Sequence, residues 1–110
     1  MKNRQEAINY CKQYKDVYED EPFRDDNWTL IRHKDNDKTF AWIFERENKI
    51  WINVKNEPGM NEQLRNEYES IVPAYHLNKE HWNSIILDGS VSEKEIHELI
   101  STSYDLTKNK

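Results

Sequence analysis

The fold is decided by residues 28–55, WTLIRHKDNDKTFAWIFERENKIWINVK, where β-branched and aromatic residues dominate three segments. These segments predict strands at residues 28–32, 39–45 and 50–55. The intervening KDND and RENK, residues 34–37 and 46–49, are typical of hairpin turns because Asn and Asp tolerate positive φ. Three strands joined by short turns predict an antiparallel meander.

The register of the second hairpin stays open at the level of sequence. One register, with a two-residue turn at residues 47–48, pairs Phe44 with Trp51. It places the rings of the second strand on the face of Trp51: Phe40, Trp42 and Phe44. A turn one residue longer places these rings with the aliphatic side chains of the third strand: Ile50, Ile52 and Val54. Because side chains alternate along a strand, one residue of shift exchanges the two faces.

Elements on both sides of the meander predict a single α+β domain. Apolar periodicity and capping patterns predict helices over residues 4–18, 56–69 and 92–104, a fourth strand over residues 82–87, and extended chain over residues 71–75. The expected order is therefore α-β-β-β-α-β-α, with the helices packed on an antiparallel sheet. We expect one domain over residues 1–110, with a frayed tail at residues 106–110.

Composition limits the class of protein. Four Trp, six Tyr and three Phe supply a core despite 34% charged residues and a mean hydropathy of -1.13. No run approaches the ~20 apolar residues of a membrane span, and the start lacks an apolar segment, so we expect a cytoplasmic protein without membrane contact. Two glycines and one cysteine exclude phosphate-binding glycine loops, internal disulfides and zinc-finger spacings.

No residue set predicts an enzyme, a cofactor or a metal site. Cys11 falls on the apolar side of the first predicted helix and is expected to be a small core residue. His76 and His81 do not share a helix face, and the candidate third ligand, Asp88, is not at a useful ligand spacing from them. Catalysis would need a deep pocket in which one of these histidines meets an acid. The acids of EDEPFRDD, residues 19–26, lack calcium-loop spacing and predict a solvated loop.

Charge is distributed unevenly along the chain. Sixteen basic and 21 acidic residues give a net charge of -5, which disfavours a free-standing nucleic-acid binder. Residues 19–26 hold five acids and one arginine, a net charge of -4, whereas basic side chains gather at the two hairpin turns. Basic hairpin tips either contact a phosphate backbone or keep sheet edges soluble, and both interpretations stay open.

Four blocks resemble the MmcQ/YjbR family: PFRDDNWTLIRH (residues 22–33), KTFAWIFE with KIWINVKNEP (38–45 and 49–58), VPAYHLNKEHWNSIILDGS (72–90) and LISTSYDL (99–106). They stand in family order, cover about residues 8–106, and are most specific at YHLNKEHWN, residues 75–83. The resemblance implies a compact α+β fold similar to CyaY and to type III secretion chaperones. It also implies DNA binding through a double wing of hairpins, and it implies no enzymatic activity.

The resemblance implies two sets of site residues. The nucleic-acid set is Arg32, Lys34, Lys38, Arg46, Lys49, Lys55 and Lys79. The second set, called the signature loop below, is Tyr75, His76, Asn78, Lys79, His81, Trp82 and Asn83. Three positions depart from the family pattern: Arg24 and Ala74 stand where Gly is frequent, and Glu80 stands where Lys or Arg is common. Glu80 removes positive charge from the signature loop.

Two functions are expected from these features. The first is a DNA-binding protein that neutralises phosphates with its basic hairpins and reads few bases. The alternative is a protein-interaction module that uses an exposed aromatic sheet face, which suits the acidic balance better. A monomer without cofactors is expected in both cases. Whether the signature loop maintains the fold or recognises a ligand is left open by the sequence.

Overall fold

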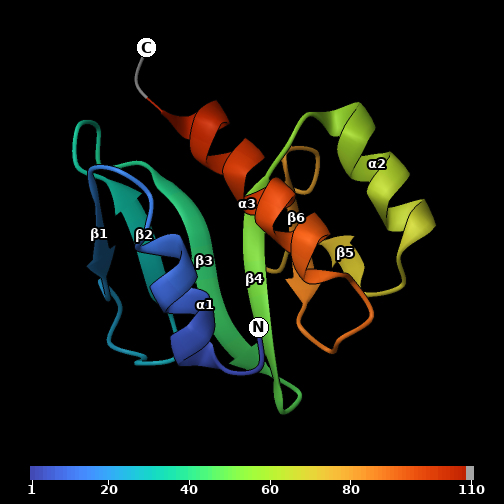
Figure 1. Cartoon of the computed structure of the whole chain (residues 1–110), viewed down its shortest axis with the longest axis horizontal. Helices are drawn as coiled ribbons and strands as arrows, with labels where there is room; N and C mark the ends of the chain where they lie inside the picture. Colours follow the sequence, from blue (N-terminus) through green and yellow to red (C-terminus); the bar gives the residue numbers. More distant parts are fainter. Residues whose placement is uncertain (109–110) are drawn as a thin grey trace.

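The computed structural model describes residues 1–108 and has three helices and six strands (Figure 1). In chain order these are α1 (Arg4–Cys11), β1 (Val17–Asp20), β2 (Thr29–His33), β3 (Thr39–Arg46), β4 (Lys49–Lys55), α2 (Pro58–Glu67), β5 (Ile71–Pro73), β6 (Trp82–Ile86) and α3 (Glu93–Thr107). The predicted α+β class with an antiparallel sheet is confirmed, and the observed order is α-β-β-β-β-α-β-β-α.

All six strands form one antiparallel sheet in the order β1-β2-β3-β4-β6-β5. The meander β2-β3-β4 lies where it was predicted. Helices α1 and α3 cross the same face of the sheet, and α2 packs near β5 at one side (Figure 1). The opposite face, which we call the open face, is covered by loops rather than by a described helix. This asymmetry leaves the open face available for a site.

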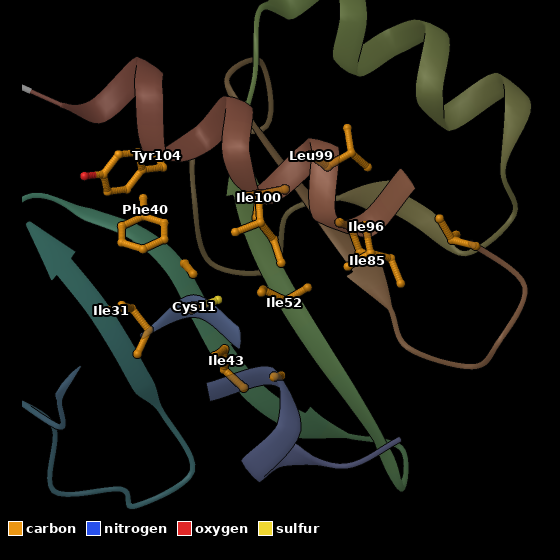
Figure 2. Close-up of a cluster of buried hydrophobic side chains, with 14 of the residues drawn as sticks. Cys11, Ile31, Phe40, Ile43, Ile52, Ile85, Ile96, Leu99, Ile100 and Tyr104 are labelled. Carbon is orange, nitrogen blue, oxygen red and sulfur yellow. The ribbon is translucent and has the colours of Figure 1, made fainter. Parts of the chain in front are cut away.

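The hydrophobic core lies between the sheet and the two crossing helices. Isoleucines from four neighbouring strands lie on the sheet face that α1 and α3 cover (Figure 2): Ile31, Ile43, Ile52 and Ile85. Helix α3 meets them with Ile96, Leu99 and Ile100, and α1 contributes Cys11. The four isoleucines and Ile100 are almost fully buried, so this layer contributes to the apolar burial that stabilises the domain.

The first helix is shorter than predicted: a turn follows it over residues 12–16, and a strand begins at Val17. Helix α1 ends at Cys11, Asp16 takes a positive φ of 56°, and β1 then pairs Val17 with His33 and Asp20 with Leu30. The spacing of apolar residues fitted a helix. However, Val17 and Tyr18 also favour a strand, and the free edge of β2 offers backbone hydrogen bonds. The short β5, inside the segment predicted as extended, accounts for the other added strand.

The second hairpin has the two-residue turn at Glu47-Asn48, because Phe44 pairs with Trp51 and both turn residues take positive φ. The prediction for that register is wrong in one respect. A β-bulge shifts the pairing between Ile31 and Arg32 of β2, so Phe40 is an extra residue opposite them. Phe40 consequently turns toward the helices and packs against Tyr104 of α3 rather than sharing the face of Trp51 (Figure 2).

Helix α3 extends beyond its predicted end. It continues to Thr107, whose side chain is buried. Oγ1 of Thr107 lies 2.7 Å from the ring nitrogen Nε2 of His33. This contact with β2 orders the turn that was predicted to begin a frayed tail at residue 106. Residues 109–110 of that predicted tail lie outside the described residues.

Candidate functional site

Aromatic rings from β3 and β4 line the open face. Trp42 and Phe44 alternate with the core residues of β3, and Trp51 lies opposite Phe44 on β4. Phe44 and Trp51 are buried beneath loops, while Trp42 is half-buried. The open face therefore presents the half-buried ring of Trp42 beside the buried rings of Phe44 and Trp51.

One covering segment is residues 21–28, which we call the acidic loop. Its anchor is Asn27, whose side-chain amide accepts a hydrogen bond from the backbone N–H of Glu45 and donates one to the carbonyl of Glu45, both at 2.9 Å. These two hydrogen bonds replace the backbone pair that a neighbouring strand would make with Glu45. They place the ring of Trp28 on that of Phe44, with centroids 4.3 Å apart and planes 21° apart. Arg4 of α1 also donates to Asn27.

The other covering segment is the start of the signature loop. Asn53 of β4 donates its side-chain N–H to the carbonyl of Tyr75 at 3.1 Å, and the N–H of Tyr75 donates to Oγ of Ser84 at 3.2 Å. Ser84 in turn donates to the side chain of Asn53. These bonds fix Tyr75 above the sheet, and His76 follows with a positive φ of 66°. Polar groups beneath the loop thus set where its two rings stand.

The two segments and β3 enclose a pocket of about 410 Å³, which we call the aromatic pocket. Its lining residues are Phe23, Asp25, Trp28, Trp42, Tyr75, His76 and Leu77. The rings of Phe23 and Trp42 lie 20° from parallel with centroids 6.4 Å apart, and Trp28 stands at 88° to Trp42 at 6.2 Å. The rings therefore form walls at right angles. Nε1 of Trp42 is buried and has no hydrogen-bond partner within residues 1–108.

The open face already holds one cation. The guanidinium carbon of Arg46 lies 4.2 Å from the ring centroid of Tyr75 and 5.1 Å from that of Trp51. These distances are within the range in which a cation is attracted to the face of an aromatic ring. The rings next to the aromatic pocket are thus oriented to receive a planar cation.

The predicted nucleic-acid residues differ in their contacts. Arg32 is engaged, since Nε lies 2.8 Å from the carboxylate of Asp20 and Nη1 donates to the carbonyl of Asp37 at 2.8 Å. Arg46 lies over aromatic rings as described and 3.9 Å from the carboxylate of Glu47. The five remaining residues form no ion pair within the described chain: Lys34, Lys38, Lys49, Lys55 and Lys79.

The two basic hairpin tips do not lie together. The β2–β3 turn and the β3–β4 turn are at opposite ends of β3 (Figure 1), which is 8 residues long. At about 3.3 Å per residue this separates the tips by roughly 25 Å. A ligand that contacted both tips would have to run along the whole length of the sheet.

The signature loop divides into two groups. Tyr75 and His76 line the aromatic pocket, whereas Asn83 is buried and donates its side-chain N–H to the carbonyl of Asn61 at 3.2 Å. Asn78 accepts from the N–H of Glu80 at 2.9 Å and so closes a turn. Trp82 pairs with β4, and the side chains of Lys79 and His81 are exposed. The block thus contributes both to the fold and to the walls of the pocket.

Sequence reasoning singled out only two walls of the pocket, Tyr75 and His76. It missed Phe23, Asp25, Trp28 and Leu77 as site residues, and it treated Trp42 only as one ring of a sheet face. One signal was present in the sequence: Phe23 is a large apolar residue within an acidic stretch. In the structure it is 47% exposed.

Reactive groups elsewhere offer little chemistry. Cys11 is buried, and burial raises the pKa of its thiol to about 12. Within the described residues no three His, Cys, Asp or Glu side chains gather as a metal ion would require. Along residues 1–108, no helix combines the length and the apolar character needed to cross a bilayer.

The chain is similar to known proteins in sequence and in fold. A family model described as YjbR matches residues 12–106. The Escherichia coli K12 protein named Uncharacterized protein YjbR is 35% identical over 83 residues, covering 76% of this chain and 70% of the relative. The Bacillus subtilis protein named Uncharacterized protein YyaQ is 34% identical over 119 residues, covering 98% and 100%. A crystal structure from Pseudomonas syringae has a TM-score of 0.86 at 35% identity, covering 96% and 99%.

Proposed function

The chain belongs to the YjbR family, and from the geometry of its open face we propose that it is a non-catalytic interaction module that binds a basic segment of a partner protein. The observation that carries this proposal is the aromatic pocket, which is bordered by an acidic loop. Apolar rings supply contact area, and the loop's excess of carboxylates supplies attraction for a positively charged partner.

The side chains of the pocket favour binding over catalysis. Within the described chain, its lining contains no serine, threonine, cysteine or lysine, so Asp25, Tyr75 and His76 are the nucleophilic side chains that it holds. His76 and Asp25 both line it, but no hydrogen bond joins them among residues 1–108, so no oriented acid–base pair is present. Aromatic residues are also the side chains most enriched where proteins bind one another.

Selection from a random-peptide display library on the immobilised protein tests this function. We expect enriched peptides with basic residues that bind in solution, and we expect Phe23→Ser to weaken their binding about ten-fold, as for a hot-spot contact. Met60→Ser is the matched control, because Met60 is exposed to 44% on α2, away from the pocket. Absence of any enriched peptide, or equal losses in both variants, would overturn the proposal.

A second candidate is the DNA contact that the resemblance implies. The observation that favours it is the set of five lysines without ion-pair partners in the described chain. The separation of the hairpin tips and the acidic balance weigh against tight binding.

Fluorescence anisotropy of a labelled duplex tests the DNA candidate. At low salt we expect binding, and the logarithm of the association constant should fall with the logarithm of the salt concentration by about 0.9 per phosphate contacted. The double variant Lys34→Ala with Lys38→Ala should show a smaller slope. Lys2→Ala with Lys94→Ala makes the same change in net charge at two lysines outside the predicted nucleic-acid set. No binding at about 50 mM salt removes this candidate.

A further inference from the structure

We propose that the aromatic pocket is a receptor for an arginine side chain of the partner protein. This inference rests on the proposed function and specifies the chemistry that the pocket selects. Its basis is the combination of ring walls, one carboxylate, and an internal example of the same recognition on the adjacent part of the face.

The walls suit a flat cation. Trp28 stands at 88° to Trp42, so the two rings form a corner in which a planar group stacks on one ring and meets the edge of the other. A guanidinium is planar, delocalised and more weakly hydrated than an ammonium, so it stacks on aromatic faces at a lower desolvation cost than lysine does. The geometry of the rings therefore favours arginine.

The charge of the pocket has the matching sign. Asp25 contributes the carboxylate, and within the described residues neither lysine nor arginine lines the pocket. Oδ1 of Asp25 accepts a hydrogen bond from the N–H of Asn27 at 2.9 Å, which holds the carboxylate in place at the rim. Arginine presents a fork of N–H groups that a carboxylate accepts, so stacking and pairing act on the same group.

Arg46 provides the internal example. Its guanidinium lies over Tyr75, and Tyr75 is itself a wall of the aromatic pocket. One surface of this ring cluster thus already binds a guanidinium from β3, while the pocket beside it is lined by the same kinds of rings. The pocket volume of about 410 Å³ is near the lower end for small-ligand sites and accommodates one long side chain with its flanking backbone.

NMR titration with N-acetyl-arginine methylamide tests the inference. We expect shifts of the indole N–H signals of Trp28 and Trp42, with the signal of Trp82 unchanged, and affinity in the millimolar range that suits so small a ligand. The citrulline analogue is the neutral, planar control, and the lysine analogue is the non-planar cation. Arginine should bind about three- to ten-fold more tightly than either, because citrulline lacks the charge that aromatic rings attract and lysine lacks the planar group that stacks on them.

Two variants separate the contributions of charge. Asp25→Asn preserves the acceptor for Asn27 and should weaken arginine binding about two- to five-fold without affecting citrulline. Asp26→Asn makes the same change in net charge on a neighbouring residue that does not line the pocket, and it should leave affinity unchanged. A similar loss in both variants would refute the role of Asp25.

The outcomes distinguish this inference from the proposed function. Equal binding of arginine and citrulline, or tighter binding of lysine, overturns arginine selection while peptide binding at Phe23 still stands. Absence of any shift at Trp28 and Trp42 with all three probes overturns the inference as well. Arginine binding that displaces the display-selected peptides supports both.

Discussion

Replacing Arg65 of α2 by Met should lower the free energy of unfolding by about 2–3 kcal/mol. Arg65 donates from Nε to Oδ1 of Asn83 at 2.6 Å, and its Nη2 donates to the carbonyl of Lys79 and to that of Trp82. Asn83 is 2% exposed, and Arg65 is the donor found for its Oδ1 in the described chain. Without the guanidinium, the buried Oδ1 of Asn83 is left unpaired, at a cost of about 1–3 kcal/mol. Loss of the less buried hydrogen bonds to the carbonyls of Lys79 and Trp82 adds roughly 0.5–1 kcal/mol.

Urea unfolding followed by tryptophan fluorescence measures this change, together with a thermal midpoint lower by roughly 10 °C. Arg24→Met is the matched control, because Arg24 is exposed, and it should stay within about 0.5 kcal/mol of the unsubstituted protein. A double-mutant cycle with Asn83→Leu should give a coupling of at least about 1 kcal/mol. A loss below about 0.5 kcal/mol for Arg65→Met, or an additive cycle, would refute the view that this bond anchors the signature loop.

Three further results are expected. Burial, with Lys108 nearby, holds the pKa of His33 below its ordinary value. The unfolded chain therefore binds more protons than the folded chain below about pH 6.5. The free energy of unfolding should fall as the pH drops through that range. Urea unfolding of His33→Gln should show a flatter pH dependence. Cys11, with its pKa raised to about 12, should resist alkylation at pH 8 in the native protein and react only after unfolding, as intact-mass measurements would show. Glu47→Asn should stabilise the β3–β4 hairpin by about 0.5 kcal/mol, because Glu47 has a φ of 55° that Asn tolerates better; equal thermal midpoints for Glu47→Asn and the control Glu47→Gln would contradict this.

The meander could be predicted from the sequence because its signal is local. Residues 28–55 alternate and are rich in β-branched and aromatic side chains, and the polar turns between the segments limit where each strand ends. The register stayed open because neither Glu47 nor Asn48 is glycine, so the sequence did not mark the two residues that take positive φ. Strand β1 was missed for a different reason: its pairing with β2 is a tertiary contact, and that contact overrides the helical spacing of residues 14–18.

The candidate site depends still more on tertiary structure. Tyr75 and His76 were singled out by resemblance, but Phe23 and Trp28 reach the same pocket only because Asn27 docks the acidic loop on Glu45. A side-chain amide that takes the place of a backbone partner in a sheet leaves no periodic pattern in the sequence. The separation of the basic tips, in contrast, follows from the meander itself, since successive hairpins turn at opposite ends of their shared strand.

The β-bulge at Phe40 lets β3 direct aromatic rings to both faces of the sheet. The extra residue, Phe40, packs against Tyr104 of α3, and two positions further along the strand Trp42 lies on the open face. A substitution at Trp42 therefore changes the ring contacts with Phe23 and Trp28 on the open face, whereas the contact of Phe40 with Tyr104 lies on the other face of the sheet. Deleting Phe40 would restore a regular ladder in which Thr39 pairs with Arg32 and Ala41 with Ile31, and it would remove the ring that packs against Tyr104.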